Sequence, residues 1–231
     1  MQETTKYLCE NIQGCVLGYT QSDEITLILV DYQKLTSSAW FDYEVQKLCS
    51  ISASMATMAF NKYFAENVAN EILEYKTSMV PQCIEIQQEI KEYHDTLRAA
   101  VNKGAMFDAR CFNIPKEEVT NLIYWRQLDA TRNSIQMVGQ ANFSHKELQN
   151  KSCNDIQDML HEQKGINWND FPVDCKRGAA VIKKKIGTNI AAACGIAGAT
   201  YENRWVIDRN MPMLKGEDRK YLDDLVYVGE S

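Results

Sequence analysis

The chain has 231 residues, of which 45% are hydrophobic and 24% are charged, so it can bury a sizeable core as one large domain or two small ones. Its net charge of -6 at pH 7 argues against a protein that coats nucleic acid by bulk electrostatics, although a local basic patch could still bind phosphates. There is no apolar run near the ~20 residues of a membrane span, no recognisable signal peptide, and no CxxC or zinc-ligand spacing among the eight cysteines. We therefore expect a soluble cytoplasmic protein whose thiols stay reduced.

The first elements are predicted to be a short helix and a β-hairpin. Residues 2–11 read as the end of a helix that enters a turn at Gly14. Two apolar stretches, 15–20 and 25–30, follow with the polar residues 21–24 between them, which is the signature of a hairpin. Asp23 and Glu24 should therefore lie at or beside a strand-to-strand turn.

The middle of the chain is predicted to contain two long helices separated by a strand. Residues 43–75 carry apolar or small side chains at spacings of three and four, which predicts an amphipathic helix. Residues 107–114 alternate as a half-buried strand would. Pro115 then begins a helix with Glu117 and Glu118 in its first turn, where the helix dipole favours acids.

That second helix carries a polar stripe, because Arg126, Asp129 and Asn133 recur at helical spacing. From spacing alone the stripe could brace a site, hold a nucleotide, or form an exposed or inter-subunit surface. Two capping boxes are predicted next, with Ser144 and Ser152 as the N-caps. A loop at 165–169 and a strand at 204–207 follow.

This element order predicts an α+β fold, in which helices pack on one face of an antiparallel sheet. The chain has no P-loop, no Rossmann glycine fingerprint, only three histidines and no GxSxG around any serine, so the carboxylates are the main candidates for chemistry. Asp23 with Glu24 at a hairpin turn is the arrangement of a palm-type nucleotidyltransferase, because divalent cations need rigidly placed oxygen ligands. A turn acid is nevertheless more often a solvated residue, and a two-metal site also needs a second acidic strand end.

Cations at two other places could bind phosphates. Lys47 and Ser50 lie one turn apart near the start of the first long helix, where an ammonium, a hydroxyl and helix amides could meet a triphosphate. A short basic stretch later in the chain could contact RNA or a triphosphate. It contains Lys176, Arg177, Lys183, Lys184 and Lys185. In both places a solvated surface is the alternative.

Five sequence phrases carry a resemblance to a known family. They are YTQSDE at 19–24, Lys47 with Ser50, FDAR at 107–110, WRQLD at 125–129 with Asn133, and GINWN at 165–169 with Pro172 and KRG at 176–178. In this order they resemble the tRNA-His guanylyltransferase superfamily, and especially its guanylyltransferase-like branch of bacteria, archaea and phages. Where eukaryotic members that add G to tRNA-His have His-Ile-Asn-Asn, this chain has Thr-Arg-Asn-Ser at 131–134.

The resemblance implies a palm fold that adds nucleotides to an RNA 5′ end in the 3′-to-5′ direction. In such enzymes the 5′ end is activated by ATP or by its own triphosphate, the 3′-hydroxyl of the incoming nucleotide attacks it, and two Mg²⁺ ions assist. By position, Asp23 would be the catalytic metal ligand, Ser22 would touch the nucleotide, and Lys47 and Ser50 would hold the triphosphate of GTP or ATP. The supporting residues would be Glu24, Asp108, Arg110, Arg126, Asp129 and Asn133.

The resemblance also divides the chain and implies its partners. Residues 1–142 would form an N-terminally incomplete palm catalytic domain, and 143–231 a smaller, mostly helical C-terminal domain. The substrate would be tRNA, in 5′-end maturation or repair, and the assembly a homotetramer.

One departure limits the prediction. The family's Arg-x-Asp-Gly-x-x-Phe strand, which supplies the other metal carboxylate, does not occur in the chain. We interpret the chain as a fragment rather than a degenerate member, because the downstream phrases are intact. The alternative function is a non-catalytic RNA-binding or assembly module. A nucleotide or diguanylate cyclase is a weaker alternative, which the WRQ helix and the GINWN loop disfavour.

Overall fold

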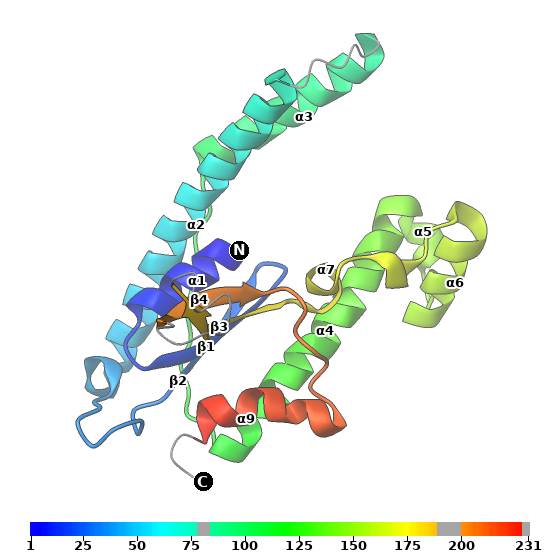
Figure 1. Cartoon of the computed structure of the whole chain (residues 1–231). Helices are drawn as coiled ribbons and strands as arrows, with labels where there is room; N and C mark the ends of the chain where they lie inside the picture. Colours follow the sequence, from blue (N-terminus) through cyan, green and yellow to red (C-terminus); the bar gives the residue numbers. More distant parts are fainter. Residues whose placement is uncertain (78–83, 189–199, 228–231) are drawn as a thin grey trace. The chain divides into compact units, whose positions relative to one another are not determined.

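The computed structural model describes residues 1–77, 84–188 and 200–227 (Figure 1). The chain forms two compact units, one from residues 1–40 and 112–231 and the other from 41–111.

The first unit contains a four-stranded antiparallel sheet with the order β2-β1-β3-β4. The predicted hairpin is confirmed as β1 (Cys15–Gln21) and β2 (Glu24–Leu29), and the predicted strand at 204–207 lies within β4 (Tyr201–Asp208). The remaining strand, β3 (Ala179–Gly187), pairs with both β1 and β4.

Strand β1 lies at the centre of this unit and is buried along its whole length. Helix α1 (Gln2–Asn11) covers one face, where a Cβ on Gly18 would lie 2.5 Å from the Cys9 sulfur. On the other face Leu17 and Tyr19 join a core with α4 (Lys116–Asn142) and α9 (Lys220–Val226). The predicted helical layer on one face is therefore present, and α1 adds cover on the opposite face.

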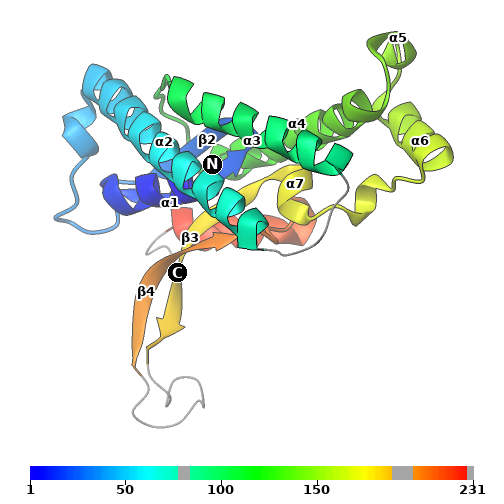
Figure 2. The same cartoon turned by 90° about the horizontal axis from the view of Figure 1, so that it is seen from above.

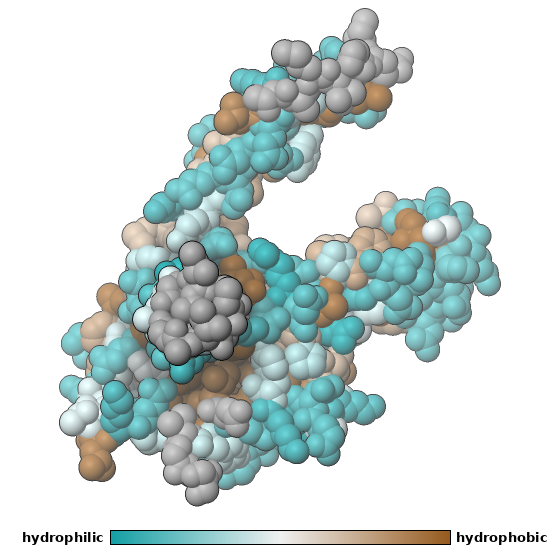
Figure 3. Space-filling view, in the orientation of Figure 1, coloured by the Kyte–Doolittle hydropathy of each residue, from teal (hydrophilic) through white to brown (hydrophobic). Residues whose placement is uncertain are grey.

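Two short helices follow α4 and begin as predicted. Ser144 and Ser152 form reciprocal capping boxes at the starts of α5 (His145–Leu148) and α6 (Cys153–Lys164). Helix α6 ends at Gly165, which takes the left-handed conformation. The outer face of α6 is mostly hydrophilic (Figure 3). The chain continues through η2 (Trp168–Asp170) and α7 (Val173–Arg177) into β3, and η3 (Gly216–Arg219) leads into α9.

The C-terminal region contributes two strands to the sheet as well as helices. Because β3 pairs with β1, residues on both sides of position 142 build one sheet. The predicted division into 1–142 and 143–231 remains a prediction, while the compact units divide the chain at 40–41 and 111–112.

The second unit consists mainly of α2 (Val45–Thr77) and α3 (Ile84–Lys103), and α2 confirms the predicted long helix. The two helices pack together, with the rings of Tyr75 and His94 5.3 Å apart. Short η1 (Trp40–Tyr43) precedes α2.

The prediction of a strand at 107–114 is wrong. No strand is present there. The expected alternation exists only at 107–110, where Phe107 and Ala109 are half-buried and Asp108 and Arg110 exposed, and Cys111 is exposed. The physical reason is that side chains of α2 hold the segment, with the backbone N–H of Phe107 donating to Thr57 Oγ1 at 3.0 Å.

No helix in the described ranges is long and apolar enough to cross a membrane.

Candidate functional site

The turn of the β1–β2 hairpin presents the carboxylate of Asp23 without a partner in the described residues. Gln21 and Glu24 are the last paired residues of the two strands, and Ser22 takes a positive φ of 49° in the tight turn between them. Ser22 and Asp23 are both exposed. Within the described part of the chain, Asp23 has no hydrogen bond or ion pair, so its oxygens are available to a ligand.

Glu24, beside it, is committed to structural contacts. Its carboxylate accepts hydrogen bonds from Gln21 Nε2 at 2.9 Å and from Arg126 Nη1 at 3.0 Å. Its carbonyl accepts another from the Thr20 hydroxyl at 2.9 Å. The resemblance implies a supporting role for Glu24, and in the structure its side chain joins the turn to α4.

Tyr19 anchors the end of β1 that leads into the turn. Its side chain is only 1% exposed, and its hydroxyl donates to the carbonyl of Arg177 at 2.6 Å. Burial raises the pKa of Tyr19 well above its usual range, and the carboxylates of Asp129 and Glu24 raise it further, against the opposing effect of Arg126.

Gly178 allows β1 and the end of α7 to approach closely. It has φ +82°, and a Cβ there would lie 2.6 Å from both the Thr20 carbonyl oxygen and the Tyr19 hydroxyl. The KRG phrase therefore fits against β1 because its third residue has no side chain.

The GINWN loop and Lys176 are joined to α4. Trp168 Nε1 donates to Ser134 Oγ at 3.2 Å, and Ser134 Oγ donates to the Lys176 carbonyl at 3.2 Å. The Lys176 ammonium donates to the carbonyl of Asn169 at 2.6 Å and lies over the Trp168 ring. Lys176 is buried, so it has the least favourable position for RNA among the five predicted cations.

The polar stripe of α4 divides into two parts. Arg126 reaches the hairpin through Glu24, whereas Asp129 accepts hydrogen bonds from Arg132 at 2.7 Å and Asn133 at 3.1 Å on its own helix. Of the open alternatives, bracing of the turn is therefore the observed contact for Arg126.

Two supporting residues were not singled out from the sequence. One is Tyr19, whose hydroxyl-bearing side chain is buried in strand β1. The other is Gln127, which is fully buried and bonds the Pro212 carbonyl and the Leu214 N–H. Its position four residues after Ile123 on the buried face of α4 was the available signal.

Lys47 and Ser50 lie at the start of α2 in the second unit, whereas Asp23 belongs to the first. Both side chains are exposed, and Lys47 pairs with Glu44 at 2.7 Å. The hydrogen bond from Lys47 to Glu44 raises the pKa of the lysine. Asp108 and Arg110 form a loose ion pair at 3.5 Å, also in the second unit and highly exposed.

The remaining predicted cations lie on or near the β3–β4 hairpin, whose outer part extends away from the core of the first unit (Figure 2). Lys183 lies 4.9 Å from the Trp205 ring and Lys185 lies 5.1 Å from the Tyr201 ring. Because side chains alternate between faces, these four share one face, and Lys184 points to the other, where it pairs with Asp208 at 3.0 Å. Arg177 is half-buried at the end of α7.

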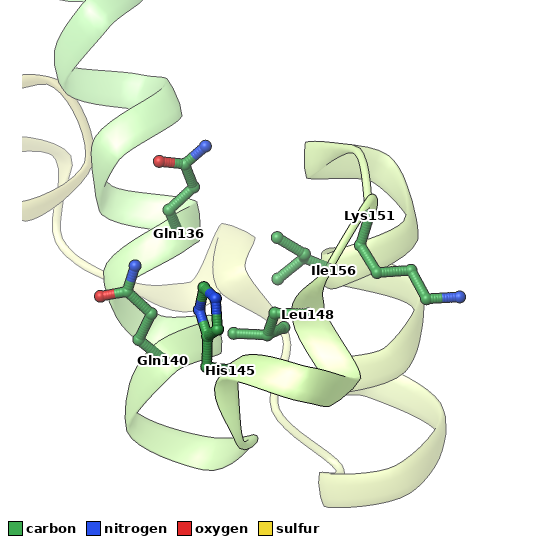
Figure 4. A pocket seen from close by; sticks show the side chains of 6 residues that line it. All are labelled: Gln136, Gln140, His145, Leu148, Lys151 and Ile156. Carbon is green, nitrogen blue, oxygen red and sulfur yellow. The ribbon is translucent and has the colours of Figure 1, made fainter.

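A separate hollow of about 180 Å³ lies between α4 and the α5–α6 region (Figure 4). Its lining residues are Gln136, Gln140, His145, Leu148, Lys151 and Ile156. It is smaller than the ~300 Å³ or more of typical small-molecule sites, and it contains none of the predicted site residues.

The residues described supply no group of three or more His, Cys, Asp or Glu side chains that could hold a metal ion. At the hairpin turn Asp23 is the available carboxylate, since Glu24 is paired with Arg126. One unpaired carboxylate does not complete the two-magnesium site that the resemblance implies.

The chain resembles known guanylyltransferases in sequence and in fold. Residues 1–115 match the family model of tRNAHis guanylyltransferase. The structure is similar to a bacterial tRNAHis guanylyltransferase (Thg1)-like protein solved in complex with ATP, with 38% identity over 98% of this chain and 77% of that one, and a TM-score of 0.70. A bacterial Thg1-like protein in complex with GTP is 34% identical over 97% of this chain and 75% of that one, with a TM-score of 0.66.

Two further proteins are more distant. The guanylyltransferase of Saccharomyces cerevisiae is 20% identical over 78% of this chain and 70% of that one, and its TM-score of 0.51 supports the fold. The uncharacterized protein R259 of Acanthamoeba polyphaga mimivirus is 28% identical over 186 residues, which are 76% of this chain but 58% of the viral protein. The predicted α+β palm-like fold is confirmed by these structural matches.

Proposed function

Because this chain belongs to the tRNAHis guanylyltransferase family, we propose that it is a nucleotidyltransferase that adds nucleotides from GTP to the 5′ end of tRNA in the 3′-to-5′ direction. The observation that carries the proposal is the 38% identity, over 98% of the chain, to a bacterial relative that was solved with bound ATP. The similar protein solved with GTP supports the choice of nucleotides. The process served would be 5′-end maturation or repair of tRNA, by a cytoplasmic homotetramer.

The residue roles are proposed for each unit separately. In the first unit, Ser22 contacts a nucleotide at the exposed hairpin turn, beside Asp23. In the second unit, Lys47 and Ser50 at the start of α2 hold a triphosphate. Arg126 contributes by pairing with Glu24, which leaves Asp23 as the available acid of the turn. Tyr19, Gly178 and the contacts beneath them keep the turn in place, so its exposed residues need little reorganisation on binding.

Magnesium fits this site only in part. Asp23 can supply oxygen ligands of the kind that Mg²⁺ prefers. The described residues contain no group of three or more His, Cys, Asp or Glu side chains that could hold the ion, and the neighbouring Glu24 carboxylate is paired with Arg126. The two-magnesium mechanism remains part of the proposal by family resemblance alone.

For tRNA, we propose contact through the face of the β3–β4 hairpin that carries Lys183, Lys185, Tyr201 and Trp205. Lysines can neutralise phosphates there, and aromatic rings can stack on unpaired bases. Replacing Lys183 and Lys185 by Gln should weaken tRNA binding and reduce its salt dependence, with Lys184→Gln as the control from the opposite face. Equal loss in both variants would contradict the assignment of this face.

The decisive experiment measures magnesium-dependent incorporation of labelled GTP into a 5′-triphosphorylated tRNA that lacks its first nucleotide. It uses two proteins, this chain and the longest natural form of the protein that contains it. For each, the wild type is compared with the Asp23→Asn variant. Asp158→Asn, an exposed acid of α6, is the matched control. We expect incorporation with the wild type and the control, and loss of at least about a hundredfold with Asp23→Asn. If no form adds nucleotide while all bind tRNA, the proposal fails.

The second candidate is the non-catalytic RNA-binding or assembly module. It is favoured by one observation, the single available carboxylate at the turn within the described chain. Normal tRNA binding without incorporation, unchanged by Asp23→Asn, would establish it.

A further inference from the structure

The segment 104–111 of the second unit packs along helix α2. Asn61 holds its start with two hydrogen bonds to Ala105, one from the side-chain amide to the Ala105 carbonyl at 2.9 Å and one from the Ala105 N–H at 2.8 Å. One helical turn earlier on α2, Thr57 Oγ1 accepts from Phe107 N–H at 3.0 Å. The ring of Phe60 lies 5.4 Å from that of Phe107. The segment therefore runs along α2 in the opposite direction.

This arrangement brings two cysteines together. From Asn61 back to Cys49 the helix spans roughly 18 Å, at about 1.5 Å per residue. From Ala105 to Cys111 an extended chain spans roughly 20 Å, at about 3.3 Å per residue. The two lengths match, so the register fixed by Asn61 and Thr57 places Cys111 opposite Cys49, and their sulfurs are 3.7 Å apart.

The two thiols are also accessible to small molecules. Cys111 is exposed and Cys49 is half-buried. A second neighbouring pair, Cys9 and Cys15, offers a contrast, because both of its members are buried in the core of the first unit.

We propose that Cys49 and Cys111 are a dithiol site that exchanges with small disulfides, such as oxidised glutathione, to form a reversible intramolecular disulfide. The Cys111 thiolate attacks one sulfur of glutathione disulfide, breaks its S–S bond and releases one glutathione thiol. The Cys49 thiolate then attacks the sulfur of Cys111 in this mixed disulfide and releases the second glutathione. Two protein thiols are oxidised, one glutathione disulfide is reduced, and the two thiol protons pass to the two glutathione molecules.

The disulfide would fasten the second end of the segment. Asn61 and Thr57 hold 105 and 107, whereas the hydrogen bond between the thiols is a weak contact at 111. Because the bond would close a loop between residues 62 apart, it would restrict the unfolded chain strongly. At a reducing glutathione ratio the pair remains two thiols. The site does not depend on the proposed enzymatic function.

The test equilibrates the native chain in glutathione buffers of increasing disulfide content, blocks free thiols in acid and maps tryptic peptides without reduction. We expect a cross-linked species of peptides 48–62 and 111–116 to appear first, while peptide 7–34, which holds Cys9 and Cys15, stays reduced. In Cys49→Ser, a glutathione adduct on Cys111 should accumulate instead. Cys175→Ser, which removes an exposed cysteine elsewhere, should leave the cross-link unchanged.

A second readout is thermal unfolding. Oxidation should raise the unfolding midpoint by about 5 °C or more in the wild type and not in the double variant Cys49→Ser/Cys111→Ser. The proposal is overturned if Cys111 collects glutathione in the wild type without linking to Cys49, or if neither thiol reacts before the chain unfolds. Since no nucleotide or RNA is involved, either result is independent of the incorporation assay.

Discussion

At the hairpin turn, the exposed Asp23 rests on buried contacts made by Tyr19 and Gly178, whereas at the start of α2 Lys47 and its partner Glu44 both lie at the surface. Both regions are proposed to contact nucleotides. The difference indicates that the turn is positioned in advance by the core, while the lysine can move to its ligand. Changes near the turn should therefore affect folding as well as binding, and changes at the start of α2 should affect binding alone.

The largest effect is expected from Gly178→Ala. The new Cβ would lie 2.6 Å from the Thr20 carbonyl and the Tyr19 hydroxyl, at a φ of +82°. We expect a loss of roughly 3 kcal/mol or more in the free energy of unfolding, measured by urea denaturation. The control is Gly165→Ala, where φ is also positive but nothing lies within 4 Å of the new atom, and its cost should be about 1 kcal/mol. Equal losses would mean that close packing beneath the turn is unimportant.

Tyr19→Phe should come second, because it removes the hydrogen bond to the Arg177 carbonyl inside the core. We expect a loss of about 1–2 kcal/mol at neutral pH. The raised pKa of Tyr19 also predicts a pH effect, since the unfolded chain releases the phenol proton first as the pH rises. This stabilisation is complete below about pH 10 and is lost as the pH rises through the folded-state pKa. The free energy of unfolding of the wild type should therefore fall more steeply above pH 10 than that of Tyr19→Phe. Parallel pH profiles of the two proteins would disprove a link between the Tyr19 pKa and stability.

Arg126→Met should have a smaller effect. The Arg126–Glu24 pair is 3.0 Å long but both side chains are about half exposed, so water screens the attraction. We expect a cost below about 1 kcal/mol, which should diminish in 1 M salt. A larger, salt-independent loss would show that the pair holds the turn more firmly than its exposure suggests.

Lys47→Met should have no measurable effect on the free energy of unfolding, because the ammonium is solvated. It should weaken GTP binding about tenfold, as expected for the loss of one charge-assisted contact to phosphate, measured by calorimetry. Lys62→Met, an exposed lysine further along α2, is the control and should change neither quantity. Unaltered GTP affinity in Lys47→Met would remove this lysine from the site.

The features that sequence patterns predicted well are those determined by near neighbours in the chain. The hairpin around Asp23, the helix after Pro115 and the caps at Ser144 and Ser152 depend on residues within a few positions of each other. The burial of Lys176, by contrast, depends on contacts with Trp168 and Asn169 that the family resemblance of this phrase does not predict.

The features that were missed depend on distant partners. Alternation at 107–114 correctly predicted that Phe107 and Ala109 face inward, but it also placed the exposed Cys111 on that face. It could not show that Thr57 and Asn61 of α2 would replace a neighbouring strand. Likewise, nothing local to Lys183 or Trp205 shows that β3 joins β1 in one sheet.

The central place of β1 has a consequence for synthesis of the protein. One edge of β1 pairs with β2 immediately after it, but the other pairs with β3, where Leu17 is opposite Ile182. At ribosomal rates of about 5–20 residues per second, that edge would wait roughly 8–30 s for its partner. Throughout this interval the nascent hairpin presents unpaired backbone groups to other chains, so the yield of folded protein should depend on what covers β1 while translation continues.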